Sequence, residues 1–129
     1  MSAPELLRRL DELVHEMKAL GYAERDVRGT RLSVSEALTN SLQHGHAGDC
    51  SKKISLRYRV DRSQVVIEIE DQGSGFDQHK VRDPTDTADP CRRIGRGIYL
   101  MRAYMTSVRF NARGNRVRLC KRFSQAAVH

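Results

Sequence analysis

The sequence is poor in the residues and the apolar runs that mark several classes of protein. It has only three cysteines, Cys50, Cys91 and Cys120, which lie far apart and form no C-x-x-C motif. This pattern argues against a disulfide scaffold or a zinc cage and suits a reducing cytoplasm. No apolar run approaches the roughly 20 residues that cross a bilayer, and the N-terminus has no signal-peptide core. We therefore expect neither an integral membrane protein nor a secreted one.

Aromatic residues are also scarce, at 5% of the chain with no tryptophan. The charge is one-sided: 23 lysines and arginines against 16 acidic residues give +7, which favours anionic partners. Nucleic acid, an acidic protein and a nucleotide triphosphate all fit that charge. Arg116, Arg118 and Arg122 alternate near the C-terminus. Because a nucleic-acid platform needs stacking aromatics, a solvated sheet face is the simpler interpretation of these arginines.

Length and composition fit one globular domain over residues 1–129. The chain is 39% hydrophobic and 30% charged, with no repeat, low-complexity tract or interdomain linker. A chain of this size buries roughly two-thirds of its unfolded surface, so it supports a core without metals or disulfides.

Two helices are expected in the first third of the chain. From Leu6 to Leu20 the apolar residues recur at steps of three and four, which predicts an amphipathic helix. Ser2 and Glu5 are expected to form a capping box at its start, and Gly21 is expected to stop it. A second helix is predicted from about Glu24 to His44 and is ended by glycines.

After the second predicted helix, apolar residues alternate with polar ones, as in strands, and one further short stretch is again helical. The predicted elements are hairpin strands at 54–60 and 65–70, a loop from Gln72 to Arg93, a short helix from about Gly97 to Met105, and a second hairpin with strands at 107–111 and 116–122. This order predicts an α/β fold: a two-layer sandwich, with three helices on one face of a mixed, mostly antiparallel sheet of about four strands.

A polar stripe on the second predicted helix is the first candidate for chemistry. Glu36, Asn40 and His44 follow one another at steps of four, so they project from nearly the same face. On an arbitrary amphipathic helix such a pattern is an exposed stripe. Here small and apolar residues surround it, which favours a site.

Two glycine-rich motifs are the other candidates. Asp71-x-Gly73-x-Gly75-Phe76 follows a strand, and its alternate glycines let the backbone turn sharply beside a flat ligand. Gly95-Arg96-Gly97-Ile98 opens the short predicted helix, where free N–H groups and the helix dipole favour an anion or phosphate. Each is weak alone, because an ordinary turn explains the first and no Walker lysine follows the second.

In this order the three motifs resemble those of the Bergerat-fold ATPases, a group that includes gyrase-type ATPases and histidine kinases. Glu36 to Asn40 with His44 resembles their N box, and the glycine motifs resemble their two glycine boxes. Within that group the chain is most similar to the small bacterial anti-sigma-factor serine/threonine kinases, particularly over residues 95–102 and 110–115. The resemblance covers about residues 5 to 122.

The resemblance implies a role for each motif. Asn40 would hold a Mg²⁺ ion that bridges the triphosphate, Asp71 would accept the adenine amino group, and Glu36 would be the catalytic base. Arg93 would neutralise charge on the γ-phosphate, and the amides of Gly95 to Ile98 would hold phosphates. The implied nucleotide-binding residues are Asn40, His44, Asp71, Gly73, Gly75, Phe76, Arg93, Gly95, Arg96, Gly97 and Ile98.

The function that the resemblance implies is an ATP- and Mg²⁺-dependent serine/threonine protein kinase in the cytoplasm. It would be an anti-sigma-type regulator that binds a sigma factor, phosphorylates an anti-anti-sigma partner, or both, with no direct nucleic-acid or membrane binding. Two alternatives stay open: an ATP-binding switch that sequesters a protein partner without efficient phosphotransfer, and a nucleic-acid-binding domain with steep salt dependence. Family members usually have a strand before the first helix, which this sequence lacks, so the strand number and the formation of a homodimer stay open.

Overall fold

The fold is described from a computed structural model, which describes residues 1–41, 53–72 and 92–124. For residues 92–95 that description covers the helical backbone only. The elements are α1 (Ala3–Ala19), α2 (Glu24–Asn40), β1 (Ile54–Val60), β2 (Gln64–Asp71), α3 (Arg92–Tyr104), β3 (Ser107–Phe110) and β4 (Arg116–Arg122).

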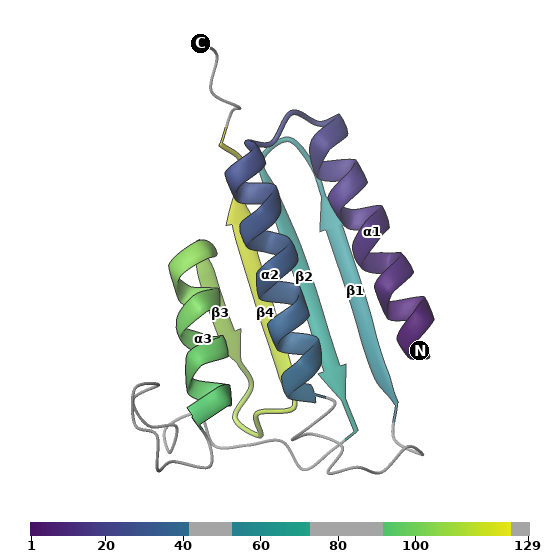
Figure 1. The fold of residues 1–129 in the computed structure, drawn as a ribbon, viewed down its shortest axis with the longest axis vertical. Coiled ribbons are helices and arrows are strands. Elements are labelled where there is room, and N and C mark those ends of the chain that lie inside the picture. Colours follow the sequence, from purple (N-terminus) through teal and green to yellow (C-terminus); the bar gives the residue numbers. More distant parts are fainter. Residues whose placement is uncertain (42–52, 73–91, 125–129) are drawn as a thin grey trace.

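The three helices form one layer and the strands form the other (Figure 1). The sheet has the order β1-β2-β4-β3. The predicted two-layer sandwich of three helices over about four strands is confirmed. The prediction of a mixed sheet is wrong for the described strands, because all neighbouring pairs are antiparallel. The chain reaches the edge strand β3 after α3, and the hairpin that follows turns β4 back antiparallel to β2.

The core lies between the two layers and is built by one face of each strand. β2 shows this most regularly: Val65, Ile67 and Ile69 are buried, and the residues between them are only partly covered. Leu13 and Met17 of α1 are completely buried on the facing helix layer. Burying such side chains contributes roughly 1.5–3 kcal/mol each, so the apolar stripe of α1 helps to hold the layers together.

The ends of α1 follow the local sequence closely. The Ser2 hydroxyl accepts a hydrogen bond from the Glu5 N–H at 3.3 Å, and Gly21 follows the helix with a φ of 86°. The helix starts at Ala3, directly after the Ser2 cap, so the predicted cap is confirmed, and a proline in the first turn also favours this start.

α2 and α3 depart from the predicted boundaries. α2 ends at Asn40, and the predicted continuation to His44 lies outside the described residues. α3 begins at Arg92 instead of near Gly97, so the predicted loop ends earlier. Glycine costs about 1 kcal/mol in a helix, and the burial of Ile98 and Met101 offsets that cost. Within the described ranges no helix is long and apolar enough to cross a membrane.

Candidate functional site

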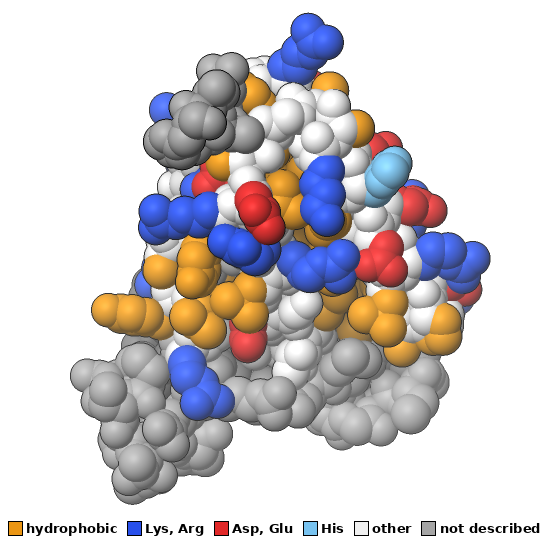
Figure 2. All heavy atoms as spheres, turned by 45° about the horizontal axis from the view of Figure 1, so that its top comes forward, with side chains coloured by type: hydrophobic (Ala, Val, Ile, Leu, Met, Phe, Trp, Pro, Cys, Tyr) orange, Lys and Arg blue, Asp and Glu red, His pale blue; other side chains and the backbone are white. Residues whose placement is uncertain are grey.

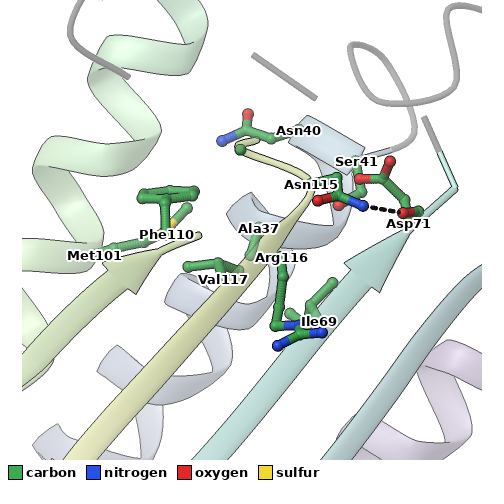
Figure 3. A pocket seen from close by; sticks show the side chains of 11 residues that line it. Ala37, Asn40, Ser41, Ile69, Asp71, Met101, Phe110, Asn115, Arg116 and Val117 are labelled. Atoms are coloured by element: carbon green, nitrogen blue, oxygen red, sulfur yellow. Dashed lines mark hydrogen bonds between the residues drawn. The ribbon is translucent and has the colours of Figure 1, made fainter. Parts of the chain in front are cut away.

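A cavity lies where the end of α2 meets the end of β2 and the start of β4. Its empty space is about 310 Å³ with the open mouth included, and the centre of a water molecule can occupy about 10 Å³ of it, which is room for about one water molecule. The residues that line it come from the end of α2, the strands β2, β3 and β4, α3 and the β3–β4 turn (Figure 3). The lining residues are Ala37, Asn40, Ser41, Ile69, Asp71, Met101, Phe110, Gly114, Asn115, Arg116 and Val117.

Asn40 is the last residue of α2 and is almost fully buried, at 5% exposed. Its side-chain Nδ2 has no hydrogen-bond partner among the described residues. A buried amide without a partner costs free energy, so such a group is a candidate for contact with a ligand. Glu36, one turn earlier on α2, is half-buried, and no hydrogen bond or ion pair to another described residue holds its carboxylate.

Gly97 of α3 lies directly against these two side chains. A Cβ atom built on Gly97 would lie 3.0 Å from Glu36 Oε2 and 3.5 Å from Asn40 Nδ2. Glycine therefore lets α3 come close to α2 at this point, because a larger residue would push on the carboxylate. The structure brings together residues from two motifs that are about 60 positions apart in the sequence.

The position of α3 corrects one expectation. The amides of Gly95 to Ile98 were expected to be free at a helix start, but α3 begins at Arg92. Free N–H groups belong to the first turn of a helix, and later ones bond to the carbonyl four residues back. Gly97 and Ile98 therefore lie too deep in α3 to offer their amides. The Ile98 side chain is buried, and Arg96 is exposed.

Asp71 is the last residue of β2 and is 4% exposed. Strand alternation directs its side chain to the helix side of the sheet, as for Ile69 two residues earlier. Two hydrogen bonds of 2.9 Å join its backbone to Asn115. The Asp71 N–H donates to the Asn115 carbonyl, and Asn115 Nδ2 donates to the Asp71 carbonyl (Figure 3). The carboxylate is therefore presented at the cavity by a fixed backbone.

Asn115 is held in turn by a second asparagine. Asn111 Nδ2 donates to Asn115 Oδ1 at 2.7 Å, and Asn111 Oδ1 accepts from the N–H groups of Gly114 and Arg116. Sequence reasoning identified the turn but missed this function for the two asparagines. The available signal was an asparagine on each side of a tight turn between strands, where Asn side chains commonly bond to backbone groups.

The other predicted site residues are only partly described. His44, Gly73, Gly75 and Phe76 lie outside the described residues. Arg93 and Gly95 belong to the first turn of α3 by their backbone. In the part of the chain that the structure describes, no group of three or more His, Cys, Asp or Glu side chains could hold a metal ion by itself.

Comparison with known proteins gives matches over most of the chain. Residues 1–121 match the family model described as the histidine kinase-like ATPase domain. The serine-protein kinase RsbW of Bacillus licheniformis is 34% identical over 96 residues, which are 70% of this chain and 60% of that protein. The anti-sigma F factor of Clostridium botulinum (strain Eklund 17B) is 33% identical over 104 residues, 77% of this chain and 73% of that protein.

A solved structure supports the fold. The histidine kinase domain from the blue-light activated histidine kinase of Erythrobacter litoralis EL346 matches with a TM-score of 0.51 and 25% identity, over 77% of this chain and 47% of that one. The chain spans about 60% of the length of the RsbW kinases that it matches.

Proposed function

The chain belongs to the histidine kinase-like ATPase family, and from this premise we propose that it is an ATP- and Mg²⁺-dependent serine/threonine protein kinase. As an anti-sigma-type regulator in the cytoplasm, it would bind a sigma factor, phosphorylate an anti-anti-sigma partner, or both. The names of two relatives, serine-protein kinase and anti-sigma F factor, support this proposal.

The meeting of Glu36, Asn40 and Gly97 beside the Asp71 cavity is the observation that carries the proposal. It puts one carboxylate and one amide at the end of α2, and a second, buried carboxylate at the end of β2. Phosphoryl transfer depends on positioning and charge stabilisation more than on covalent chemistry, so few polar groups suffice.

Asp71 fits the adenine end of the nucleotide. A nearly buried carboxylate accepts hydrogen bonds and has no donor when ionised, which matches an exocyclic amino group. Apolar side chains on the same cavity, Ile69, Met101 and Phe110, fit the flat faces of a purine. Because the cavity has room for about one water molecule between its lining side chains, nucleotide binding would require these side chains to move apart.

The residues present also fit a Mg²⁺ ion that is shared with phosphates. Mg²⁺ is usually held by few protein oxygens together with substrate phosphates, so a cluster of acidic residues is not required. Asn40 is almost fully buried and lines the cavity, and it would hold the ion through its side-chain oxygen. When bound, the ion would neutralise charge on the transferred phosphoryl group.

Glu36 would act as the general base. It lies one helical turn before Asn40, against α3, and the residue is half-buried. In this role it accepts the proton of the attacking serine or threonine hydroxyl as that oxygen bonds to the γ-phosphorus of ATP and the bond from this phosphorus to the leaving ADP breaks. A carboxylate at this position favours the kinase over an ATP-binding switch that sequesters a partner without transfer.

The experiment that tests the proposal is a partner pull-down with the intact protein, ATP and Mg²⁺, followed by mass spectrometry. A phosphorylated serine or threonine on a captured protein, absent with the Glu36→Gln variant, would support the kinase. Capture that depends on ATP but leaves the partner unmodified would support the switch instead.

A further inference from the structure

The face of the sheet that points away from the helices is dominated by arginine. All three helices lie on the opposite face (Figure 1), and every second residue of each strand faces outward. β2 contributes the glutamates Glu68 and Glu70. The other three strands contribute Arg57, Arg59, Arg109, Arg116, Arg118 and Arg122.

One row across the sheet leaves two arginines side by side. Arg57 pairs with Glu68 at 2.9 Å, Glu68 lies opposite Arg118, and Arg118 lies opposite Arg109 on β3. A like-charge pair directly opposite in neighbouring strands is unfavourable. The only glutamate in the row is already bonded to Arg57. Within the described residues no ion pair neutralises Arg109 or Arg118.

Of the two arginines in the neighbouring rows of β4, only Arg122 adds to this excess of positive charge. Arg116 is neutralised by Glu70 at 2.8 Å. Arg122 is exposed, and its side chain makes no ion pair to another described residue. The uncompensated arginines therefore gather on β3 and β4.

The helix layer differs from this face. Figure 2 shows that basic and acidic side chains are interspersed there, with hydrophobic side chains gathered on either side of them. The helix-layer ion pairs Arg31–Asp11 and Arg28–Glu24 are examples of this mixing. On the sheet face, by contrast, positive charge prevails. This charge excess is separate from the proposed nucleotide site.

We propose that the β3–β4 side of the outer sheet face docks an acidic segment of a partner protein, with Arg109, Arg118 and Arg122 binding its carboxylates. A guanidinium group binds a carboxylate through two parallel hydrogen bonds, and arginine is enriched at protein interfaces. Carboxylates between Arg109 and Arg118 would turn the unfavourable opposition into a favourable contact.

Two other occupants fit the face less well. For a nucleic acid, none of the outward side chains of the described strands is an aromatic platform on which bases could stack. A second copy of this chain would bring the same positive excess against itself. An acidic protein meets neither obstacle.

The test uses the full chain without ATP and fluorescently labelled poly-L-glutamate as the probe, measured by anisotropy at low salt. The variant Arg109→Glu/Arg118→Glu is compared with Arg8→Glu/Arg25→Glu, which changes the charge equally at exposed positions on α1 and α2. We expect the sheet-face variant to lose about tenfold or more in affinity, and the helix-layer variant to lose much less. Amide shifts in labelled wild-type protein should cluster on β3 and β4.

Three results would overturn the proposal. One is an equal loss in both variants, which would mean that only net charge matters. Another is tighter binding of a DNA duplex than of poly-L-glutamate through the same arginines. The third is a wild-type homodimer that the sheet-face variant dissociates. Circular dichroism and thermal unfolding establish that both variants are folded. Because ATP is absent, failure here leaves the kinase proposal untouched.

Discussion

Asn115 and Asp71 are joined by two hydrogen bonds of 2.9 Å, one in each direction between the end of β2 and the turn before β4. The Asn115 side chain donates one of them and is itself held by Asn111 at 2.7 Å. An asparagine pair in the β3–β4 turn thus fixes the backbone that presents the Asp71 carboxylate to the cavity.

Replacing Asn115 with alanine should weaken adenine nucleotide binding although Asp71 stays in place. The substitution removes the bond to the Asp71 carbonyl and leaves Asn111 Nδ2 without its acceptor, a cost of roughly 1–3 kcal/mol in stability. Calorimetric titration with ATP and denaturant unfolding measure the two effects. The control is Arg57→Ala, which lies outside the cavity and removes only an exposed ion pair with Glu68. Unchanged ATP affinity in Asn115→Ala would refute the positioning role.

Gly97→Ala should impair phosphotransfer more than it impairs folding. The new Cβ would lie 3.0 Å from Glu36 Oε2, so the carboxylate must shift, while alanine favours the helix by about 1 kcal/mol. A small misplacement of a catalytic group can cost about 10²-fold in rate.

Gly29→Ala is the matched control for this change. Its Cβ would lie 2.7 Å from the Tyr104 ring, away from the cavity, so it should lower stability by roughly 1–3 kcal/mol and leave the turnover of folded protein unchanged. If both glycine variants lose turnover equally, the contact of Gly97 with Glu36 has no special role.

Asp71→Asn should weaken nucleotide binding with or without Mg²⁺, whereas Asn40→Ala should weaken only the part that needs Mg²⁺. The first change removes the acceptor for the adenine amino group and leaves mismatched polar groups, at roughly 1–3 kcal/mol. Calorimetry with ATP in Mg²⁺ and in EDTA separates the two. Equal losses under both conditions for both variants would contradict the assigned roles.

Stability should fall between about pH 10 and pH 12 because of Tyr22. Burial, with the negative charges of Asp61 and Cys120, raises the pKa of Tyr22 to about 12. The unfolded state ionises near 10, so the stabilisation is complete below that pH and is lost as the pH rises through the folded pKa.

Urea unfolding at pH 9 and pH 11 measures this effect. Tyr22→Phe should be less stable by about 1 kcal/mol at pH 9, because it loses the hydrogen bond to the Asp61 carbonyl, and should lose less stability on going to pH 11. A remaining slope is expected from Tyr58, whose pKa burial also raises. An unchanged slope in Tyr22→Phe would refute the assignment.

The parts of the structure that depend on local periodicity could be predicted from the sequence. The apolar stripe of α1 and the apolar–polar alternation of β2 each predict which face of the element is buried. The structure buries that face in both cases. The start of α3 could not be predicted in this way, because packing of Ile98 and Met101 outweighs the local effect of two glycines.

The sequence could predict which residues belong to the site but not the contacts between them. The spacing of Glu36 and Asn40 on one helix face is local, and the resemblance to a family supplied their meaning. The contact with Gly97 and the bond from Asn115 to Asp71 depend on how distant elements pack, including the register that pairs Glu70 with Arg116. No local pattern contains that register.

The central claim is that Glu36 is the general base of a protein kinase. Its most direct test is Glu36→Gln, in which the amide keeps the size of the side chain but cannot accept the proton. ATP affinity and single-turnover phosphorylation of a captured partner are measured on the same preparation. We predict nearly unchanged ATP affinity and a rate lower by about 10²–10⁴-fold. A Glu36→Gln protein that binds ATP normally and phosphorylates the partner at the wild-type rate would contradict the mechanism.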